Sequence, residues 1–315
     1  LFGQGSKSLG TIVAISSYAS YFWQPIMNLG NIFNNFINNI AYLERIFETM
    51  DEPVTVKDAE NAVKMPEIRG EVTFDHVNFS YDESKQILKD VSFTVKPGES
   101  VALVGPTGAG KSTIVNLISR FYNVNGGRVL IDGQDISQVT IHSLREQMGI
   151  MMQDSFIFSG DIEDNIRYGK LDATREEIVK ASRTVCADEF ISKMPDRYQT
   201  EVRERGSMLS QGQKQLISFA RTLLSDPAIL ILDEATSSID VQTEKALQTG
   251  LNAMLKGRTS FIIAHRLSTI RNCDKIMYID NGGIMESGTH DELMEKKGYY
   301  YKLYTAQLDE VQKAG

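Results

Sequence analysis

The stretch VALVGPTGAGKST, residues 101–113, decides the fold. A short apolar run over 101–104 ends at Gly105, and Lys111-Ser112-Thr113 begins a segment with apolar residues at helical spacing. A strand, a glycine-rich loop and a helix in this order, with G-x-x-x-x-G-K-S across the loop, are typical of a phosphate-binding loop. We therefore expect this stretch to bind a nucleoside triphosphate, rather than to be an ordinary turn before a helix.

The loop predicts most of the phosphate contacts. Lys111 is expected to reach the β- and γ-phosphates and to stabilise charge during reaction, and the Ser112 hydroxyl to ligate Mg²⁺. Glycines let backbone N–H groups approach the phosphate oxygens closely. The remaining nucleotide contacts are therefore assigned to Gly105, Pro106, Thr107, Gly108, Ala109, Gly110 and Thr113.

Composition narrows the class of protein. The 315 residues are 42% hydrophobic, which is enough for one large domain or two smaller ones. A net charge of −8 argues against a general nucleic-acid binder, so we expect no nucleic-acid partner. Cys186 and Cys273 show no metal or redox spacing and are expected to be reduced thiols.

The first 50 residues differ from the rest, because no charge occurs from Ser8 to Leu43. That is longer than the roughly 20 residues that cross a bilayer. Apolar residues from Ile32 to Leu43 form one helical stripe, and five asparagines occupy the remaining positions. Asparagine is costly against lipid, so this face is expected to meet other helices or a water-filled cavity. A buried helix of a soluble domain remains the alternative.

The remainder of the chain predicts an α/β domain after a linker. Charges, two prolines and a glycine mark residues 51–70 as the linker. Capping boxes begin helices at Thr174 and Thr289, and the second is expected to start the last helix. Strands are expected at 72–81, 87–95, 100–104, 127–136, 228–232 and 260–264, a hairpin at 275–288, and further helices at 211–224 and 243–255.

A buried strand in ILILDEA, residues 229–235, ends in two carboxylates. Ligands bind at the carboxyl ends of strands in parallel α/β sheets. Asp233 is expected to hold Mg²⁺ through water, and Glu234 to accept a proton from an attacking water. Without the phosphate loop upstream, a carboxylate here would be interpreted as a helix cap.

Leu209-Ser-Gln-Gly-Gln213 resembles the signature sequence of the ATP-binding cassette (ABC) superfamily, and the run from there to Asp240 is similar to that family throughout. The order of parts also matches over residues 71–305. Residues 8–55 resemble the final transmembrane helix of exporters that fuse a membrane domain to the cassette. The start at Leu1 fits a C-terminal fragment, and five of six membrane helices are expected upstream.

The resemblance implies roles that spacing alone does not give. Tyr81 is expected to stack on adenine, Gln153 to contact Mg²⁺ and the attacking water, and His265 to contact the γ-phosphate. Ser210 and Gly212 of the signature, with Gln211 between them, are expected to contact the γ-phosphate that a second cassette holds. Asp240 is expected to lie across the dimer seam.

Together these features predict a P-loop ABC cassette at 71–310: a mixed core sheet, an antiparallel β part and a helical subdomain at about 155–225. One transmembrane helix over 1–50 is expected to precede it.

The resemblance implies an ATPase that uses ATP and Mg²⁺, dimerises with an identical or related half, contacts membrane helices and lipid, and drives export. It is expected at the plasma membrane, with its cassette on the cytoplasmic side. A soluble cassette ATPase acting on nucleic acid or ribosomes, and a regulatory cassette that binds ATP without hydrolysis, are the alternatives. The transported substrate is left open.

Overall fold

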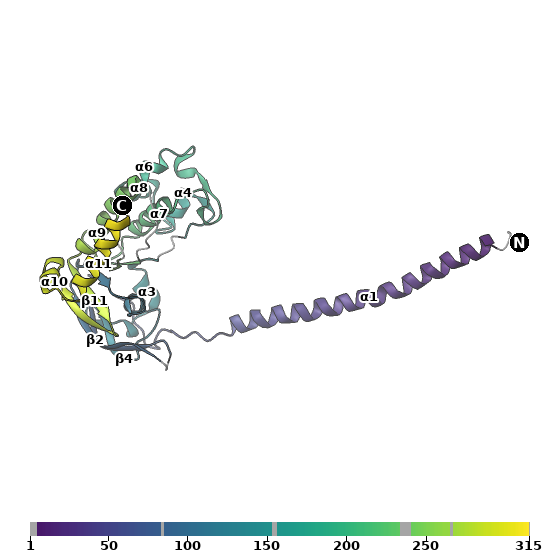
Figure 1. The fold of residues 1–315 in the computed structure, drawn as a ribbon, viewed down its shortest axis with the longest axis horizontal. Coiled ribbons are helices and arrows are strands. Elements are labelled where there is room, and N and C mark those ends of the chain that lie inside the picture. The colour runs from purple at the N-terminus through teal and green to yellow at the C-terminus, as the bar shows by residue number, and fades with distance from the viewer. Residues whose placement is uncertain (1–4, 83–84, 153–155, 234–240, 265–266, 315) are drawn as a thin grey trace. The chain divides into compact units, whose positions relative to one another are not determined.

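The computed structural model spans residues 1–315 and divides into two compact units, 1–55 and 56–315. Figure 1 shows the chain as a ribbon. The structure describes residues 5–82, 85–152, 156–233, 241–264 and 267–314.

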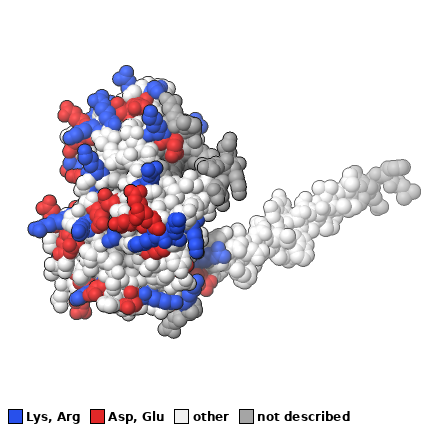
Figure 2. Space-filling model, turned by 60° about the vertical axis from the view of Figure 1, so that its left-hand side comes forward, with Lys and Arg blue, Asp and Glu red and all other residues white. Residues whose placement is uncertain are grey.

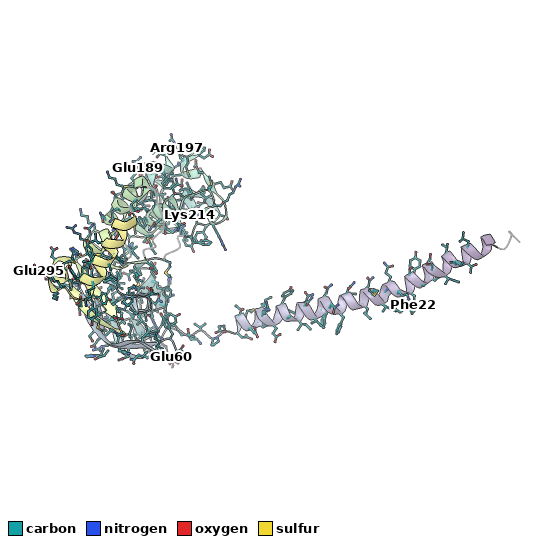
Figure 3. The ribbon with its side chains drawn as sticks, viewed as in Figure 1. Phe22, Glu60, Glu189, Arg197, Lys214 and Glu295 are labelled. Carbon is teal, nitrogen blue, oxygen red and sulfur yellow. The ribbon has the colours of Figure 1, made fainter. Side chains whose placement is uncertain are left out.

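The first unit is one helix, α1 (Gly5–Met50), of 46 residues. Pro25 lies within it, and the helix continues on both sides. Its large apolar side chains are exposed; Phe22, labelled in Figure 3, is 67% exposed. Figure 2 draws this helix almost entirely without charged side chains. Across the described part of the chain, no helix combines the length and the apolar character that crossing a membrane requires. The expected helix is present, and its place in a membrane stays a prediction.

A six-stranded sheet forms the centre of the second unit, in the order β12-β11-β3-β10-β9-β6. The pairings from β11 to β6 are parallel, and β12 pairs antiparallel with β11. Strands buried on both faces need nearly continuous apolar sequence, which β3, β9 and β10 supply. The six strands are β3 (Ser100–Val104), β6 (Met148–Met151), β9 (Ile229–Asp233), β10 (Thr259–Ile263), β11 (Lys275–Asp280) and β12 (Gly283–Gly288).

This sheet separates two hydrophobic cores, because successive side chains of a strand point to opposite faces. Val101 and Leu103 of β3 pack in one core, and Ala102 and Val104 pack in the other. Helix α2 (Lys111–Ile118) contributes to the first core. Helices α7 (Gln211–Leu224) and α8 (Val241–Leu255) contribute to the second.

A four-stranded antiparallel sheet covers the first core, in the order β2-β1-β4-β5. Phe74 and Phe93 pair across two of its strands, and their rings stack with centroids 4.5 Å apart. A turn forms at Asp132-Gly133, where both residues have positive φ, and it divides the strand expected over 127–136 into two. The strands are β1 (Val72–Ser80), β2 (Gln86–Val95), β4 (Gly126–Ile131) and β5 (Gln134–Asp135).

The region after the core strand β6 is mainly helical, and Figure 1 shows α4, α6 and α7 at the end of the unit away from β2 and β4. The predicted capping box at Thr174 is present, and the predicted helix over 211–224 is confirmed as α7. The elements are β7 (Gly160–Asp161), α4 (Ile162–Arg167), α5 (Arg175–Thr184), α6 (Asp188–Ile191), η2 (Arg197–Gln199), β8 (Glu201–Val202) and η3 (Glu204–Gly206). The shorter helices elsewhere are η1 (Ile136–Gln138), α3 (Ile141–Arg145) and α9 (Leu267–Arg271).

The C-terminal part differs from the sequence prediction in one respect. The capping box at Thr289 begins α10 (His290–Lys296), but a further helix, α11 (Tyr299–Ala314), follows it. Lys297 adopts the left-handed conformation and ends α10. The carboxylate of Glu286, on β12, accepts the first N–H groups of α11. The break is therefore fixed by a residue distant in sequence.

Candidate functional site

Four predicted site segments follow parallel strands whose carboxyl ends lie at one edge of the central sheet. The register places Leu103 beside Ile263, and Ile263 beside Asp233. Neighbouring strands are about 4.8 Å apart, so Leu103 and Asp233 lie about 10 Å apart across the sheet. The phosphate loop begins two residues after Leu103. The sheet thus brings the loop and the first carboxylate to the same edge.

The glycines of the loop have backbone conformations that other residues rarely adopt. Gly105 has φ of +139°, and a Cβ there would lie 2.1 Å from the carbonyl oxygen of Ile279 on β11. Gly108 and Gly110 also have positive φ, and Gly110 is the N-cap residue of α2. Glycine at these positions lets the loop turn tightly against the sheet and deliver its N–H groups to the start of α2.

Lys111, the first residue of α2, reaches back over the loop. Its ammonium donates to the carbonyls of Gly105 and Pro106 at 2.8 and 2.9 Å. Burial lowers the pKa of Lys111, and the negative charge of Asp233 opposes that shift. The ammonium of Lys111 therefore interacts electrostatically with the Asp233 carboxylate at the end of β9. This interaction supports one shared site for the loop and Asp233.

Tyr81 stands next to the first turn of α2. Its hydroxyl lies 3.2 Å from Oγ1 of Thr113, and its ring packs edge-on against Phe79 and Tyr122. The Tyr81 side chain is 48% exposed. The hydroxyl contact and the edge-on ring contacts hold the Tyr81 ring in place, and part of the ring stays exposed. Such a ring is suited to stack on adenine, the role that the resemblance implies. The contact with a nucleotide base stays a prediction.

Four other predicted site residues, Gln153, Glu234, Asp240 and His265, lie outside the described residues. The described strands that precede three of them are β6, β9 and β10, which are adjacent in the sheet and parallel. Their sequence positions after these strands agree with the predicted site. Their roles stay predictions.

The signature segment occupies a separate place. Ser210 is the N-cap residue of α7 and forms a reciprocal capping box with Gln213. Ser210 and Gln211 are exposed, whereas Gly212 is buried. In the described structure, no hydrogen bond joins residues 210–212 to the phosphate loop. Within the described part of one chain, the predicted ligands of the signature and those of the phosphate loop are therefore not hydrogen-bonded to each other.

A network that the sequence did not reveal is centred on Arg221 of α7. Its guanidinium donates to the carbonyls of Asn165 (2.7 Å) and Phe156 (3.0 Å), and to Oδ1 of Asn165 (3.0 Å). It also lies over the rings of Phe158 and Tyr168, with its central carbon 5.3 and 5.8 Å from their centroids. The sequence offered one signal of this network, because Arg221 is a charged residue inside the apolar pattern of α7. The sequence alone does not show that Phe156 and Asn165 are its hydrogen-bond partners.

The residues present fit a Mg²⁺ ion that takes part of its coordination from phosphates. Ser112 is exposed in the first turn of α2, and Asp233 supplies a carboxylate at the same edge of the sheet. Hydroxyl and carboxylate oxygens are ligands that Mg²⁺ prefers. Among the described residues, no cluster of three or more His, Cys, Asp or Glu side chains could hold a metal. Cys186 and Cys273, both described, form no disulfide bond, and the Cys273 thiol donates to the carbonyl of Thr269 at 3.3 Å.

The mixed sheet, with a glycine-rich loop between β3 and α2, defines a nucleotide-binding domain of the P-loop class. Residues 88–237 match the protein family described as ABC transporter. These residues form a domain of this family, which is an ATP-binding domain. The resemblance stated from the signature and phosphate-loop sequences is confirmed.

Several relatives of the chain are named as ATP-binding/permease proteins. It is 52% identical over 300 residues to an uncharacterised ABC transporter ATP-binding protein of Bacillus subtilis, YknV, covering 95% of this chain and 50% of that protein. It is 41% identical over 307 residues to an ATP-dependent lipid A-core flippase of Syntrophus aciditrophicus, covering 98% and 51%. A solved bacterial Atm1-family ABC exporter with ATP bound matches with a TM-score of 0.78 and 41% identity, covering 95% and 52%. The chain spans about half the length of the curated relatives it matches.

Proposed function

We propose that the chain is the ATP-binding and ATP-hydrolysing half of an ABC exporter. The observation that carries the proposal is the shared edge of the sheet, where the phosphate loop with Lys111 follows β3 and Asp233 ends β9, two parallel strands that both pair with β10. The names of the relatives, which include an export protein and a flippase, support transport as the coupled process.

In this proposal, Lys111 and the loop N–H groups hold the β- and γ-phosphates, and Tyr81 stacks on the base. Ser112, Gln153 and Asp233 would hold Mg²⁺, which neutralises charge that develops on the phosphates. Glu234 would accept the proton of the attacking water.

A second cassette would complete the site. Ser210 and Gly212, at the start of α7, would contact the γ-phosphate held by the partner, and Gln211 and Asp240 would lie beside the seam. An exposed N-terminus of a 14-residue helix suits an anion, because its N–H groups and dipole face the ligand. The partner would be an identical chain or a related half.

Helix α1 would then be the last helix of the membrane domain, and its asparagines would face other helices or a water-filled path. Its exposed apolar side chains support partners that cover them. The protein would reside in the plasma membrane with its cassette in the cytoplasm.

The test is ATP hydrolysis by the full-length protein. The Glu234→Gln variant should bind ATP as the wild type does, while phosphate release falls by about 100-fold or more. Lys111→Ala should lose both binding and hydrolysis. Wild-type turnover by Glu234→Gln would remove that carboxylate from its role, and absence of hydrolysis by the wild type would favour a regulatory cassette.

A further inference from the structure

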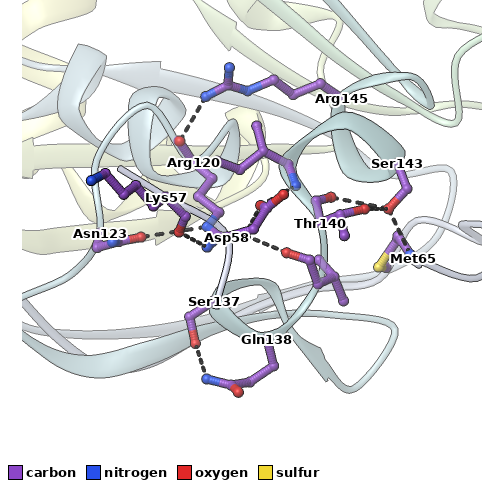
Figure 4. Close-up of polar contacts among 12 residues, drawn as sticks. Lys57, Asp58, Met65, Arg120, Asn123, Ser137, Gln138, Thr140, Ser143 and Arg145 are labelled. Atoms are coloured by element: carbon purple, nitrogen blue, oxygen red, sulfur yellow. Dashed lines mark hydrogen bonds and ion pairs between the residues drawn. The ribbon is translucent and has the colours of Figure 1, made fainter. Parts of the chain in front are cut away.

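The largest fully buried side chain of the described structure belongs to Arg120, which follows the C-terminal end of α2. Only 2% of this side chain is exposed. Its guanidinium donates to the carbonyl of Val139 and, at 3.0 Å, to the carbonyl of Lys57, which Figure 4 labels beside Arg120. A buried charge is tolerated when its donors are satisfied, and here two backbone carbonyls from distant segments and Oδ1 of Asn123 accept from the guanidinium.

Asp58, next to Lys57, strengthens the same attachment. Its carboxylate lies 3.6 Å from the Arg120 guanidinium and accepts the N–H of Ile141 at the start of α3. The Asp58 side chain is 42% exposed, so it closes the guanidinium site from the solvent side. Two adjacent residues of the predicted linker are thus fixed to the cassette by one arginine and one helix N-terminus.

The segment after this attachment is bound as well. Val63 forms a bridge with Val139, Met65 donates to Oγ of Ser143, and Ile68 donates to Oε1 of Gln147. Residues 57–70 therefore belong to the cassette, although their composition predicts a linker from 51 to 70. Residues 51–56 remain as a tether, which spans at most about 20 Å when fully extended.

Arg120 also connects this attachment to the phosphate loop. Helix α2 begins at Lys111 of the loop and ends just before Ser119. Arg145 donates to the carbonyls of Ser119 and Arg120 at 3.0 and 2.8 Å, which satisfies the end of α2. The loop, α2, Arg120 and the start of the bound segment thus form one continuous, hydrogen-bonded path.

We propose that Arg120 is a positioning residue that fixes the chain at Lys57 and Asp58 to the far end of the phosphate-loop helix. Movement of that helix with nucleotide then reaches α1 through the short tether 51–56. Loss of the contacts at both Lys57 and Asp58 moves the first attachment to Val63 and lengthens the tether to residues 51–62, at most about 40 Å. The part of this inference that concerns nucleotide rests on the proposed function.

Limited trypsin digestion of the full-length protein tests the anchor itself. The exposed Lys57 side chain is a tryptic site whose carbonyl Arg120 holds, so cleavage requires local opening. Cleavage after Lys57 should be about tenfold faster in Arg120→Lys, which corresponds to about 1.4 kcal/mol of opening free energy. Asp58→Ala should speed it several-fold without disturbing a core residue.

The matched control is Glu60→Gln, two residues further along the same segment (Figure 3). Glu60 is exposed and forms no hydrogen bond or ion pair with the described residues, so its substitution should leave cleavage unchanged. Wild-type cleavage rates in both Arg120→Lys and Asp58→Ala would overturn the proposal. Should Arg120→Lys fail to fold, Asp58→Ala still decides, because its side chain lies at the surface.

Spin labels at Glu48→Cys on α1 and Glu295→Cys on α10 test the transmission. With native cysteines replaced and labelled protein diluted in unlabelled protein, Mg-ATP should shift the wild-type distance distribution. In Asp58→Ala the distribution should broaden and at least half of that shift should be lost, with hydrolysis within twofold of wild type. Equal shifts in both proteins would overturn the proposal. A wild type that neither hydrolyses ATP nor shifts would instead refute the proposed function, and the trypsin result would still test the anchor.

Discussion

Replacement of Arg221 by Met removes the network that joins α7 to the segment at Phe156. The substitution keeps an unbranched side chain but deletes three hydrogen bonds, with donor–acceptor distances of 2.7, 3.0 and 3.0 Å. It leaves two carbonyl groups without their guanidinium partner. At about 1–1.5 kcal/mol for each bond, the cassette should lose about 3–5 kcal/mol of unfolding free energy. For a domain of this size, that corresponds to a fall in Tm of roughly 10 °C.

Scanning calorimetry of the full-length protein measures this fall, and Arg183→Met is the matched control. Arg183 on α5 is 71% exposed and pairs with Asp188, so its loss should cost less than about 1 kcal/mol. Arg221→Lys keeps the charge and should recover part of the stability. An Arg221→Met protein that melts within about 3 °C of wild type would refute the energetic role of the network.

The same variant has an expected functional consequence. Phe156 lies three residues after Gln153 in the sequence, so loosening its carbonyl should disturb the predicted water-positioning side chain. Below the melting temperature of both proteins, we expect turnover to fall about tenfold with ATP affinity unchanged, because the phosphate loop is not part of the network. A matching loss of ATP affinity would show that Arg221 acts on the whole cassette instead.

Three further outcomes follow from single contacts. Gly105→Ala should destabilise the cassette by several kcal/mol and abolish ATP binding, whereas Gly133→Ala, with positive φ but open space, should cost only about 1–2 kcal/mol on thermal melting. Ser210→Ala should cost about 1 kcal/mol through its lost cap, yet reduce hydrolysis far more than that. The hydrogen bond with Asp90 raises the pKa of His76 above 6.5, so the pair stabilises the fold fully below pH 6.5 and loses its effect as pH rises through the raised pKa. Titration by NMR should return that pKa to near 6.5 in Asp90→Asn, and an unchanged value would contradict the pairing.

Local sequence rules predicted most elements of the cassette. The buried strand before Asp233, the hairpin at 275–288 and the capping boxes at Thr174 and Thr289 depend on neighbouring residues, and the structure confirms them. The separate helix α11 was not predicted, because the carboxylate of Glu286 that starts it lies 13 residues upstream.

Long-range polar contacts explain what sequence patterns did not show. Charges and prolines in 51–70 predict a linker, yet Arg120, more than 60 residues later, binds its backbone. Arg221 is likewise a lone charge within an apolar pattern until Phe156 and Asn165 are placed beside it. The candidate site was predictable in its loop and in Asp233, because strand order in a parallel sheet brings strand ends together.

Trapping of ATP by mixed dimers tests most directly whether two chains complete each other's site. In a Glu234→Gln background, Lys111→Ala and Ser210→Ala are placed either on the same subunit or on opposite subunits, and ATP that survives rapid gel filtration is counted. Sites shared between subunits predict one trapped ATP per dimer when the substitutions are on opposite subunits, and none when both are on one. The reverse pattern would show that each chain uses its own Ser210, and would contradict the account.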